Sequence, residues 1–383
     1  MLISTFRSGN FEISIYNSLE KIISGRWDEM KSKILHSDYL QFIEESKPGD
    51  LKFRYVFIEE ITGDKKKICG ILYFQILKFT KKNIHFNKSI LLSILASLVL
   101  KFRPFNFLIC GNLFAVNFPA ICFIEDKINR NQLLEILTEI QKRQKSDVFI
   151  LKDLDDNFSP SLMEEFNLMP YKSDVTMSLN IDPVWNTIDD YVKCLTKKYK
   201  KRTEKIIHAG KKMILKELNA GEILIESKQI RNLFKQVVLK QTVRMGLIGE
   251  NYFYEFKKRF PDQFSFIGYY YNSNLVAFTS YIDHEKILEI HYIGINYNFN
   301  KELMIYFNIL LQGLEKAIQL KKEQLELGRT AREAKANIGG KAVYFNDYIN
   351  INGKLANFLS EKFTAYFQNE MGEEWAERHP FRK

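Results

Sequence analysis

Short apolar runs bounded by polar turns alternate along the chain with longer segments in which apolar residues recur at helical spacing. The short runs are typical of strands, and the longer segments are typical of amphipathic helices. In the first half, the short runs predict strands at Phe53–Glu59, Ile68–Leu77, Phe105–Cys110, Ile121–Ile124 and Val148–Leu151. The longer segments predict helices at Arg26–Leu35, Tyr39–Glu45, Ile90–Leu100 and Asn131–Arg143.

The second half, which begins after Asp182-Pro183, mixes strands and helices in the same way. A helical stretch runs from about Thr187 to Gly210. Further elements are predicted as strands at Met213–Glu217, Phe264–Tyr271, Leu275–Ile282, Ile287–Ile295 and Leu325–Gly328, and as helices at Gln229–Thr242 and Lys301–Lys321. Because 383 residues are enough for two cores, we expect two layered α/β domains, residues 1–182 and 183–383.

The two halves share one order of elements: a helix, a strand, a short polar turn and a second strand. The copies are Tyr39–Phe42, Phe53–Ile58 and Cys69–Phe74 in the first half, and Tyr252–Phe256, Phe264–Tyr269 and Leu275–Phe278 in the second. This similarity predicts an internal repeat, and a repeat bears directly on the choice of fold.

The composition, with 46% hydrophobic and 14% aromatic residues, predicts an ordered chain. The charge-free run Ile90–Leu100 is much shorter than the roughly 20 apolar residues that cross a membrane. It predicts a buried helix; the alternative is a helix lying on a membrane surface, since Lys101 and Arg103 follow it directly.

Positive charge is concentrated in one segment. Residues 197–212 hold eight Lys or Arg against one acidic residue, within a net charge of +10. Such a segment could face phosphates, an acidic carrier protein or an anionic membrane, or it could be the solvated face of a helix.

Cysteine spacing and the N-terminus indicate the compartment. Cys69, Cys110, Cys122 and Cys194 form no C-x-x-C pair, which argues against a zinc site and favours reduced thiols in a cytoplasm. The first residues lack a basic start followed by a long apolar core, so no signal peptide is predicted. We expect a cytoplasmic protein, with peripheral contact to the inner membrane face as an option, and no bound metal.

The clearest motif is a strand–helix–strand run in the second half. Its strands are Leu288–Gly294 and Leu325–Thr330, and the G-R-T of Gly328–Thr330 is followed by E-x-K-x-x-x-G at Glu333–Gly339. With the ending Trp375–Phe381, this run resembles the signature half of Fem-like proteins of the GNAT superfamily, bacterial peptidoglycan-bridge aminoacyltransferases and related N-acyltransferases. The resemblance covers about residues 185–383. It implies tandem GNAT-like lobes with mixed central sheets flanked by helices, and acyl transfer to an amine.

The acyl donor is open. Acetyl-CoA-binding GNAT enzymes have a glycine-rich loop, R/Q-x-x-G-x-G/A, whose backbone N–H groups hold the pyrophosphate. Here the corresponding stretch, Ile295–Glu302, has no glycine and contains Tyr297 and Phe299. This departure favours an acyl carrier protein or an aminoacyl-tRNA held by side-chain charge, with acyl-CoA as the remaining option and no permanently bound cofactor. The residues expected to bind the donor are Lys197, Lys198, Lys201 and Arg202.

The candidate catalytic residues are His291 and Glu289. Residues two apart on a strand share one face, and a His beside a carboxylate is a good proton acceptor near neutral pH. The alternative is a structural His bonded inside the sheet. Amine acylation needs no covalent nucleophile, so the lack of a Ser or Cys elbow does not argue against an enzyme.

The candidate substrate-binding residues gather at the G-R-T motif. Arg329 could bind a carboxylate or phosphate through two parallel hydrogen bonds, or form a salt bridge, for instance to Glu333. Lys335 could hold an anionic group or be solvated. Other expected lining residues are Thr330, Glu333, Tyr281 and Tyr292, although aromatic residues in sheets are more often core.

Three functions remain open from the sequence. We favour amide formation by transfer of an acyl group, expected to be long, from a thioester donor to an amine, including the amine of a lipid precursor. The first alternative is aminoacyl-tRNA-dependent transfer to a peptidoglycan precursor, although no long helical arm is evident between Lys197 and Gly249. The second is a non-catalytic RNA- or carrier-binding protein, which would have no need of Glu289, His291 and Arg329.

Overall fold

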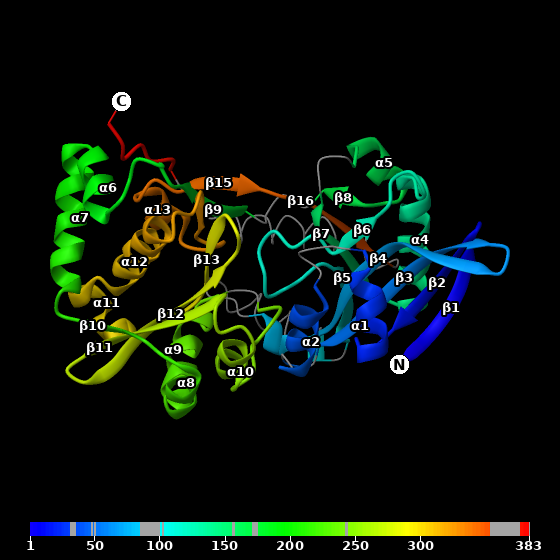
Figure 1. Ribbon diagram of the computed structural model, residues 1–383, viewed down its shortest axis with the longest axis horizontal. Coiled ribbons are helices and arrows are strands. Elements are labelled where there is room, and N and C mark those ends of the chain that lie inside the picture. Colours follow the sequence, from blue (N-terminus) through cyan, green and yellow to red (C-terminus); the bar gives the residue numbers. More distant parts are fainter. Residues whose placement is uncertain are drawn as a thin grey trace. The chain divides into compact units, whose positions relative to one another are not determined.

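The computed structural model describes residues 1–30, 36–46, 49, 51–84, 100–101, 103–154, 158–170, 175–241, 244–352 and 376–382. The chain divides into two compact units, each with its own sheet (Figure 1). Unit 1 comprises residues 1–174, 242–249 and 345–371, and unit 2 comprises residues 175–241, 250–344 and 372–383. Residues 175–182, before the expected boundary, therefore lie in unit 2.

Unit 1 is built on a sheet with the order β1-β2-β3-β4-β5-β7-β16-β8, and β6 pairs with β4. Its strands are β1 (Leu2–Ser8), β2 (Phe11–Tyr16), β3 (Lys52–Thr62), β4 (Lys65–Phe79), β5 (Phe105–Cys110), β6 (Ile121–Phe123), β7 (Val148–Leu154), β8 (Met169–Pro170) and β16 (Asn346–Ile351). Its helices are α1 (Lys21–Asp28), α2 (Ser37–Glu45), α4 (Arg130–Gln144) and α5 (Pro160–Glu165). Strands β5 and β7 are parallel, and α4 connects them.

Helix α4 shows how local sequence fixes such an element. Asn129 and Gln132 form a reciprocal capping box, in which each side-chain oxygen accepts the other residue's backbone N–H at 2.9–3.0 Å. Beyond the cap, the helix buries an apolar stripe that includes Leu133 and Leu137.

Unit 2 is built on a sheet with the order β10-β11-β12-β13-β14-β9-β15. Its strands are β9 (Val175–Asn180), β10 (Ile214–Glu217), β11 (Phe264–Tyr271), β12 (Asn274–Asp283), β13 (Ile287–Ile295), β14 (Gln324–Glu326) and β15 (Lys341–Tyr344). Its helices are α6 (Ile188–Cys194), α7 (Lys197–Gly210), α8 (Ala220–Ile225), α9 (Ser227–Val238), α10 (Tyr252–Arg259), α11 (Tyr297–Leu303), α12 (Ile305–Gln319) and α13 (Arg332–Ala336). Strands β13 and β14 are parallel, with α11 and α12 between them in the chain.

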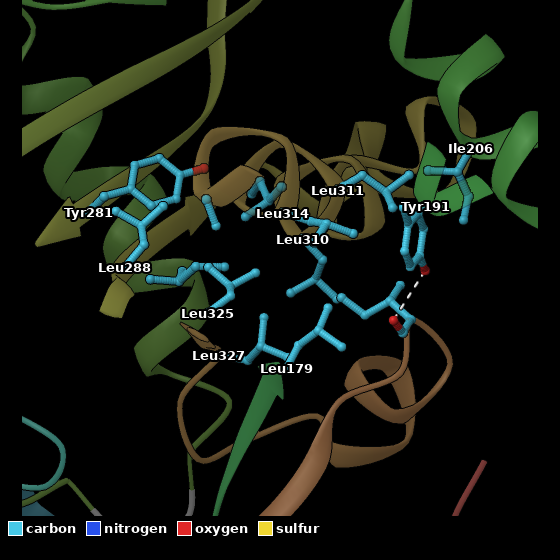
Figure 2. Close-up of a cluster of buried hydrophobic side chains, with 14 of the residues drawn as sticks. Leu179, Tyr191, Ile206, Tyr281, Leu288, Leu310, Leu311, Leu314, Leu325 and Leu327 are labelled. Carbon is cyan, nitrogen blue, oxygen red and sulfur yellow. Dashed lines mark hydrogen bonds between the residues drawn. The ribbon is translucent and has the colours of Figure 1, made fainter. Parts of the chain in front are cut away.

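The core of unit 2 lies between the sheet and α12. Leu288 and Leu325 of the parallel strands contribute to it, together with Leu310 and Leu314 of α12 (Figure 2). Leu314 is fully buried, and burying such a side chain stabilises a fold by about 1.5–3 kcal/mol. This packing fixes β13 against β14, and the candidate site depends on that register.

The pattern of the sequence predicted most of these elements. Strands β5, β11 and β13 have the predicted bounds residue for residue. Helix, strand, turn and strand recur as α2-β3-β4 and α10-β11-β12, and among the described residues each unit has one parallel strand pair, which confirms the repeat. The predicted mixed α/β fold is likewise confirmed.

Two helix predictions need correction, and one helix was not predicted. The helix expected at Lys301–Lys321 begins at Ile305, because Met304 adopts a left-handed φ of +49°. The residues before it form α11, where an open loop was expected. The stretch Thr187–Gly210 is two helices, since Leu195 and Thr196 are extended.

Two helices predicted in unit 1 include residues that the structure does not describe. The predicted Arg26–Leu35 helix appears instead as α1, which ends at Asp28, and residues 31–35 fall outside the described ranges. The run Ile90–Leu100 also lies outside the described residues, except for Leu100. Within the ranges that the structure describes, no helix is long and apolar enough to cross a membrane.

Candidate active site on the second sheet

Polar side chains gather where β13 and β14 part. The parallel pairing ends with Glu289 opposite Glu326, and β13 then continues to Ile295 while β14 stops. The carboxyl ends of parallel strands are where α/β sheets usually hold their ligands. The two carboxyl groups therefore stand at the same level, at a place suited to a site.

A β-bulge sets the directions of the side chains on β13. The register with β12 shifts between Thr279 and Tyr281, so that His291 and Tyr292 together stand opposite Ser280. The Ser280 hydroxyl accepts the Tyr292 N–H at 3.1 Å and donates to the Tyr292 carbonyl at 3.3 Å. As a result, both His291 and Tyr292 contact residues of the helices on the face away from α12.

These helices supply aromatic neighbours. The Tyr292 ring meets Phe234 of α9 edge-on, with ring centroids 5.4 Å apart. The His291 ring lies nearly parallel to that of Tyr252 on α10, at 5.9 Å. The polar groups are thus enclosed by apolar walls, where electrostatic interactions are stronger than in water.

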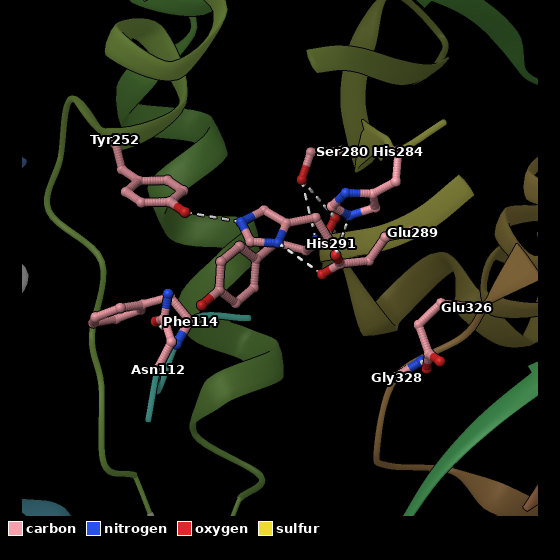
Figure 3. Close-up of polar contacts among 10 residues, drawn as sticks. Asn112, Phe114, Tyr252, Ser280, His284, Glu289, His291, Glu326 and Gly328 are labelled. Atoms are coloured by element: carbon pink, nitrogen blue, oxygen red, sulfur yellow. Dashed lines mark hydrogen bonds and ion pairs between the residues drawn. The ribbon is translucent and has the colours of Figure 1, made fainter. Parts of the chain in front are cut away.

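A continuous line of hydrogen bonds crosses this face (Figure 3). The Tyr252 hydroxyl lies 2.8 Å from His291 Nε2, and His291 Nδ1 lies 3.2 Å from Glu289 Oε1. Glu289 Oε2 lies 3.0 Å from Nε2 of His284. The side chains of His291 and Glu289 are 1% and 6% exposed, whereas that of His284 is 51% exposed.

Glu289 is held as a carboxylate. Burial on its own would raise the pKa of Glu289, but hydrogen bonds from His284 and His291 lower it to about 2. Because a carboxylate only accepts hydrogen bonds, His291 Nδ1 donates to Glu289, and Nε2 lies against the Tyr252 hydroxyl. Both ring nitrogens of His291 are therefore engaged.

The pKa of the second carboxyl group, that of Glu326, is shifted in the opposite direction. Burial raises the pKa of Glu326 to about 7, and the neighbouring charge of Glu289 adds to the rise, while the Gly328 N–H at 2.8 Å opposes it. Two carboxyl groups side by side with pKa values pushed apart are typical of acid–base sites. Glu326 was not among the site residues predicted from the sequence. Its isolated charge in Leu325-Glu-Leu327, at the end of a strand, was the available signal.

The G-R-T motif forms the turn after β14. Gly328 has a φ of +79°, a conformation that favours glycine, and its carbonyl accepts the Lys335 ammonium at 2.9 Å. Lys335 is only 3% exposed, so it ties the turn to α13. Burial raises the pKa values of Glu326 and Tyr292, and the charge of Arg329 lies close enough to oppose both rises in part. Thr330 is exposed.

The remaining predicted lining residues lie elsewhere. Glu333 pairs with Arg378 of the C-terminal segment, not with Arg329, the partner considered from the sequence. Tyr281 is fully buried in the core beside α12 (Figure 2). The structure thus brings together Glu289, His291, Tyr292 and Arg329 and adds Tyr252, His284 and Glu326 to them.

Helix α7 presents the predicted basic residues to solvent. Lys197, Lys198, Lys201 and Arg202 are all exposed, while Thr203 and Ile206 are buried. The Arg202 guanidinium lies over the Phe307 ring at 4.8 Å. This arrangement suits an anionic partner and also suits a solvated face.

No group of three or more His, Cys, Asp or Glu within the described residues is arranged to hold a metal ion. The buried Cys69 thiol is a poor nucleophile, because burial raises its pKa to about 11.

Comparison with solved structures identifies the fold. The chain is similar to a tandem GNAT protein from the clavulanic acid biosynthesis pathway, with 9% identity and a TM-score of 0.52 over 90% of this chain and 99% of that one. It is also similar to FemX, with 8% identity and a TM-score of 0.50 over 84% and 93% of the two chains. No family model and no curated protein matches the sequence. The chain therefore has a tandem GNAT-type, Fem-like fold, as its motifs indicated.

Proposed function

We propose that the chain is an N-acyltransferase that moves an acyl group from a thioester donor to an amine and so forms an amide. The fold is compatible with this chemistry, and one observation carries the proposal. At the end of the parallel strand pair, Glu289 stays ionised while its neighbour Glu326 has a pKa of about 7. A proton acceptor works best when its pKa is near the working pH.

In the proposed reaction, Glu326 takes a proton from the ammonium form of the acceptor. The free amine attacks the thioester carbonyl, the C–S bond of the tetrahedral intermediate breaks, and the extra proton on the nitrogen passes to the departing thiolate, which gives the amide and the thiol. The partial exposure of Glu326 supports this role, because a substrate must reach the carboxyl group.

The proposed part of His291 and Glu289 differs from simple proton abstraction. Since both ring nitrogens of His291 are hydrogen-bonded, the pair acts on the reaction through the Tyr252 hydroxyl. Tyr252 then supplies or accepts the proton at the substrate.

Substrate contacts are proposed around the G-R-T turn. Arg329 and Thr330 would hold an anionic group of the acceptor, and Tyr292 would form a wall of the site. Lys335 and Glu333 would contribute by fixing the turn and the C-terminal segment, as their contacts with Gly328 and Arg378 suggest. Tyr281, in the core, would support β12 from behind.

The donor is proposed to dock on α7. Lys197, Lys198, Lys201 and Arg202 would bind the acidic surface of an acyl carrier protein or the phosphates of acyl-CoA. A long acyl chain, and the amine of a lipid precursor at the inner membrane face, fit the aromatic-rich composition.

Aminoacyl-tRNA-dependent transfer to a peptidoglycan precursor is the second candidate, because the exposed basic face of α7 would also suit RNA phosphates. A protein that only binds RNA or a carrier is the third.

An assay of thiol release tests the proposal. The purified chain is mixed with long-chain acyl-CoA or acyl-loaded carrier protein, with and without a panel of primary amines. We expect one thiol released for each amide formed, only when an amine is present, with the activity lost in Glu326→Gln. Glu323→Gln is the matched control, because this nearby carboxylate is exposed and pairs with Lys286.

Three other outcomes would count against the proposal. Amine-dependent consumption of aminoacyl-tRNA with intact thioesters would establish the second candidate. Salt-sensitive RNA binding without turnover of either donor would establish the third. Equal activity in Glu326→Gln and the parent would remove the assigned site.

A further inference from the structure

The turn after β14 places a carboxyl group and a guanidinium at the end of the parallel strands. Glu326 and Arg329 are three residues apart, and Gly328 between them turns the chain with a φ of +79°. The Glu326 carboxyl group bends back onto this turn, where its Oε1 accepts the Gly328 N–H at 2.8 Å (Figure 3). Both side chains are partly exposed, so a solute can reach the two groups together.

Arg329 does not neutralise Glu326. A guanidinium bonded to a carboxyl group lowers the pKa of that group by about 1–3. The pKa of Glu326 is instead raised from 4.5 to about 7, because burial is the largest cause and Arg329 is the weakest of those that oppose it. The charge of Arg329 also acts on Tyr292 of β13. The guanidinium therefore lies beside the ends of both strands, and Glu326 does not cancel its charge.

Two other cations near the turn hold the protein's own groups. The Lys335 ammonium donates to the Gly328 carbonyl at 2.9 Å and is only 3% exposed. Arg378 of the C-terminal segment pairs with Glu333. Arg329 is thus the cation that the turn presents to a ligand. Its single charge matches a carboxylate better than a phosphate monoester, which carries a charge of about −1.5 to −2.

We infer that the acceptor is an α-amino acid, whose ammonium lies against Glu326 and whose carboxylate is held by Arg329. The inference rests on the proposed function and names its substrate class. One carbon atom joins the two charged groups of an α-amino acid, and Glu326 and Arg329 likewise lie on the two sides of one short turn. A simple amine would bring its ammonium near the like charge of Arg329 without a group to balance that charge.

The reaction with this acceptor balances. Glu326 takes one proton from the ammonium, the nitrogen forms a bond to the thioester carbonyl carbon, and the C–S bond breaks. The extra proton on the nitrogen passes to the thiolate, while the carboxylate stays unchanged on Arg329. Glu326 then releases its proton to water, which its partial exposure permits. The products are an N-acyl amino acid, a thiol and one proton, and with a long acyl chain the N-acyl amino acid is itself a lipid.

Pairs of acceptors that differ only by the carboxylate test the inference in the parent protein. Glycine is compared with methylamine, leucine with isopentylamine and phenylalanine with phenethylamine in the assay of thiol release. Losing a hydrogen-bonded charge pair costs about 10–100-fold in kcat/KM. We therefore expect the amino acids that react to be preferred over their decarboxylated amines by about this factor.

Three variants assign this preference to Arg329. In Arg329→Gln, kcat/KM for the amino acids should fall by about 10–100-fold, mainly through a higher KM, whereas kcat/KM for the amines should not fall. Arg329→Lys keeps the charge but loses the two parallel hydrogen bonds, so it should restore part of the preference. Arg231→Gln is the matched control, because Arg231 lies on α9 and pairs with Glu250, and it should keep the preference of the parent.

A binding measurement separates this inference from the proposed function. In isothermal titration calorimetry without a donor, the amino acids should bind the parent at least about 10-fold more tightly than Arg329→Gln. Binding that depends on Arg329, without any thiol release, would keep the amino acid site and reject acyl transfer. Thiol release at equal rates with amino acids and their amines would keep the function and overturn the inference. A preference for amino acids that is unchanged in Arg329→Gln would also overturn it, and neither binding nor turnover of any acceptor would reject both.

Discussion

Replacing Glu326 by glutamine should make the protein more stable at alkaline pH while removing its proposed activity. The pKa of Glu326 is raised from 4.5 to about 7, first by burial and then by Glu289. The folded protein therefore binds this proton more tightly than the unfolded chain does. The stabilising effect is fully present below pH 4.5 and is lost as the pH rises through 7.

The size of the effect follows from the pKa difference. A difference of about 2.5 corresponds to about 3 kcal/mol at 1.36 kcal/mol each, and allowing for the partial exposure of Glu326 gives about 2 kcal/mol. The amide introduced in Glu326→Gln would be neutral at every pH and could still accept the Gly328 N–H. The variant should thus gain about 2 kcal/mol over the parent between pH 4.5 and pH 8.

Urea denaturation at these two pH values measures this gain. With a slope of about 2 kcal/mol per molar urea, the midpoint for unit 2 should rise by about 1 M relative to the parent at pH 8. Glu323→Gln should shift little, because its exposed pair with Lys286 contributes at most about 1 kcal/mol. A difference between parent and Glu326→Gln that is the same at both pH values would refute the raised pKa.

Three further predictions concern the groups around Glu326. Glu289→Gln should lower the free energy of unfolding by about 3 kcal/mol at pH 7, because the native contacts of Glu289 stabilise only its ionised form and so lower its pKa. Denaturation curves should show this loss shrinking as the pH falls from 4.5 towards 2, and a loss independent of pH would contradict the lowered pKa. Lys335→Met should cost about 1–3 kcal/mol in thermal unfolding, because it removes the charged hydrogen bond to the Gly328 carbonyl and leaves only the one from the Met177 N–H; an unchanged melting temperature would count against that contact. Charge reversal on α7 should raise KM for a carrier-protein donor at least 10-fold at low salt, whereas Lys228→Glu should not; equal effects would mean that α7 is not the docking face. The residues to reverse are Lys197, Lys198, Lys201 and Arg202.

The sequence predicted those parts of the site that depend on one strand alone. Alternation of apolar and polar residues located β13 with its observed bounds, and the two-residue repeat placed Glu289 and His291 on one face. These statements need no partner strand, so a local pattern was enough.

Contacts set by register and by distant elements could not be predicted in this way. Glu326 meets Glu289 only because the helices between the strands bring β14 into register with β13. Tyr292 joins His291 through a bulge that depends on Ser280 of the neighbouring strand. Tyr252 reaches His291 from a helix 39 residues away in the chain. In the stretch after β13, the lack of glycine was correctly noted, but the helix that forms there was not expected.

The most direct test of the central claim is the pH profile of kcat for amine-dependent thiol release, measured in the parent and in Glu326→Gln. If Glu326 accepts the proton, the parent rate should rise about tenfold per pH unit below 7 and level off above it. The variant should lose this rise and turn over about 10²–10⁴-fold more slowly. A variant that keeps both the rise near pH 7 and a rate within twofold of the parent would contradict the account.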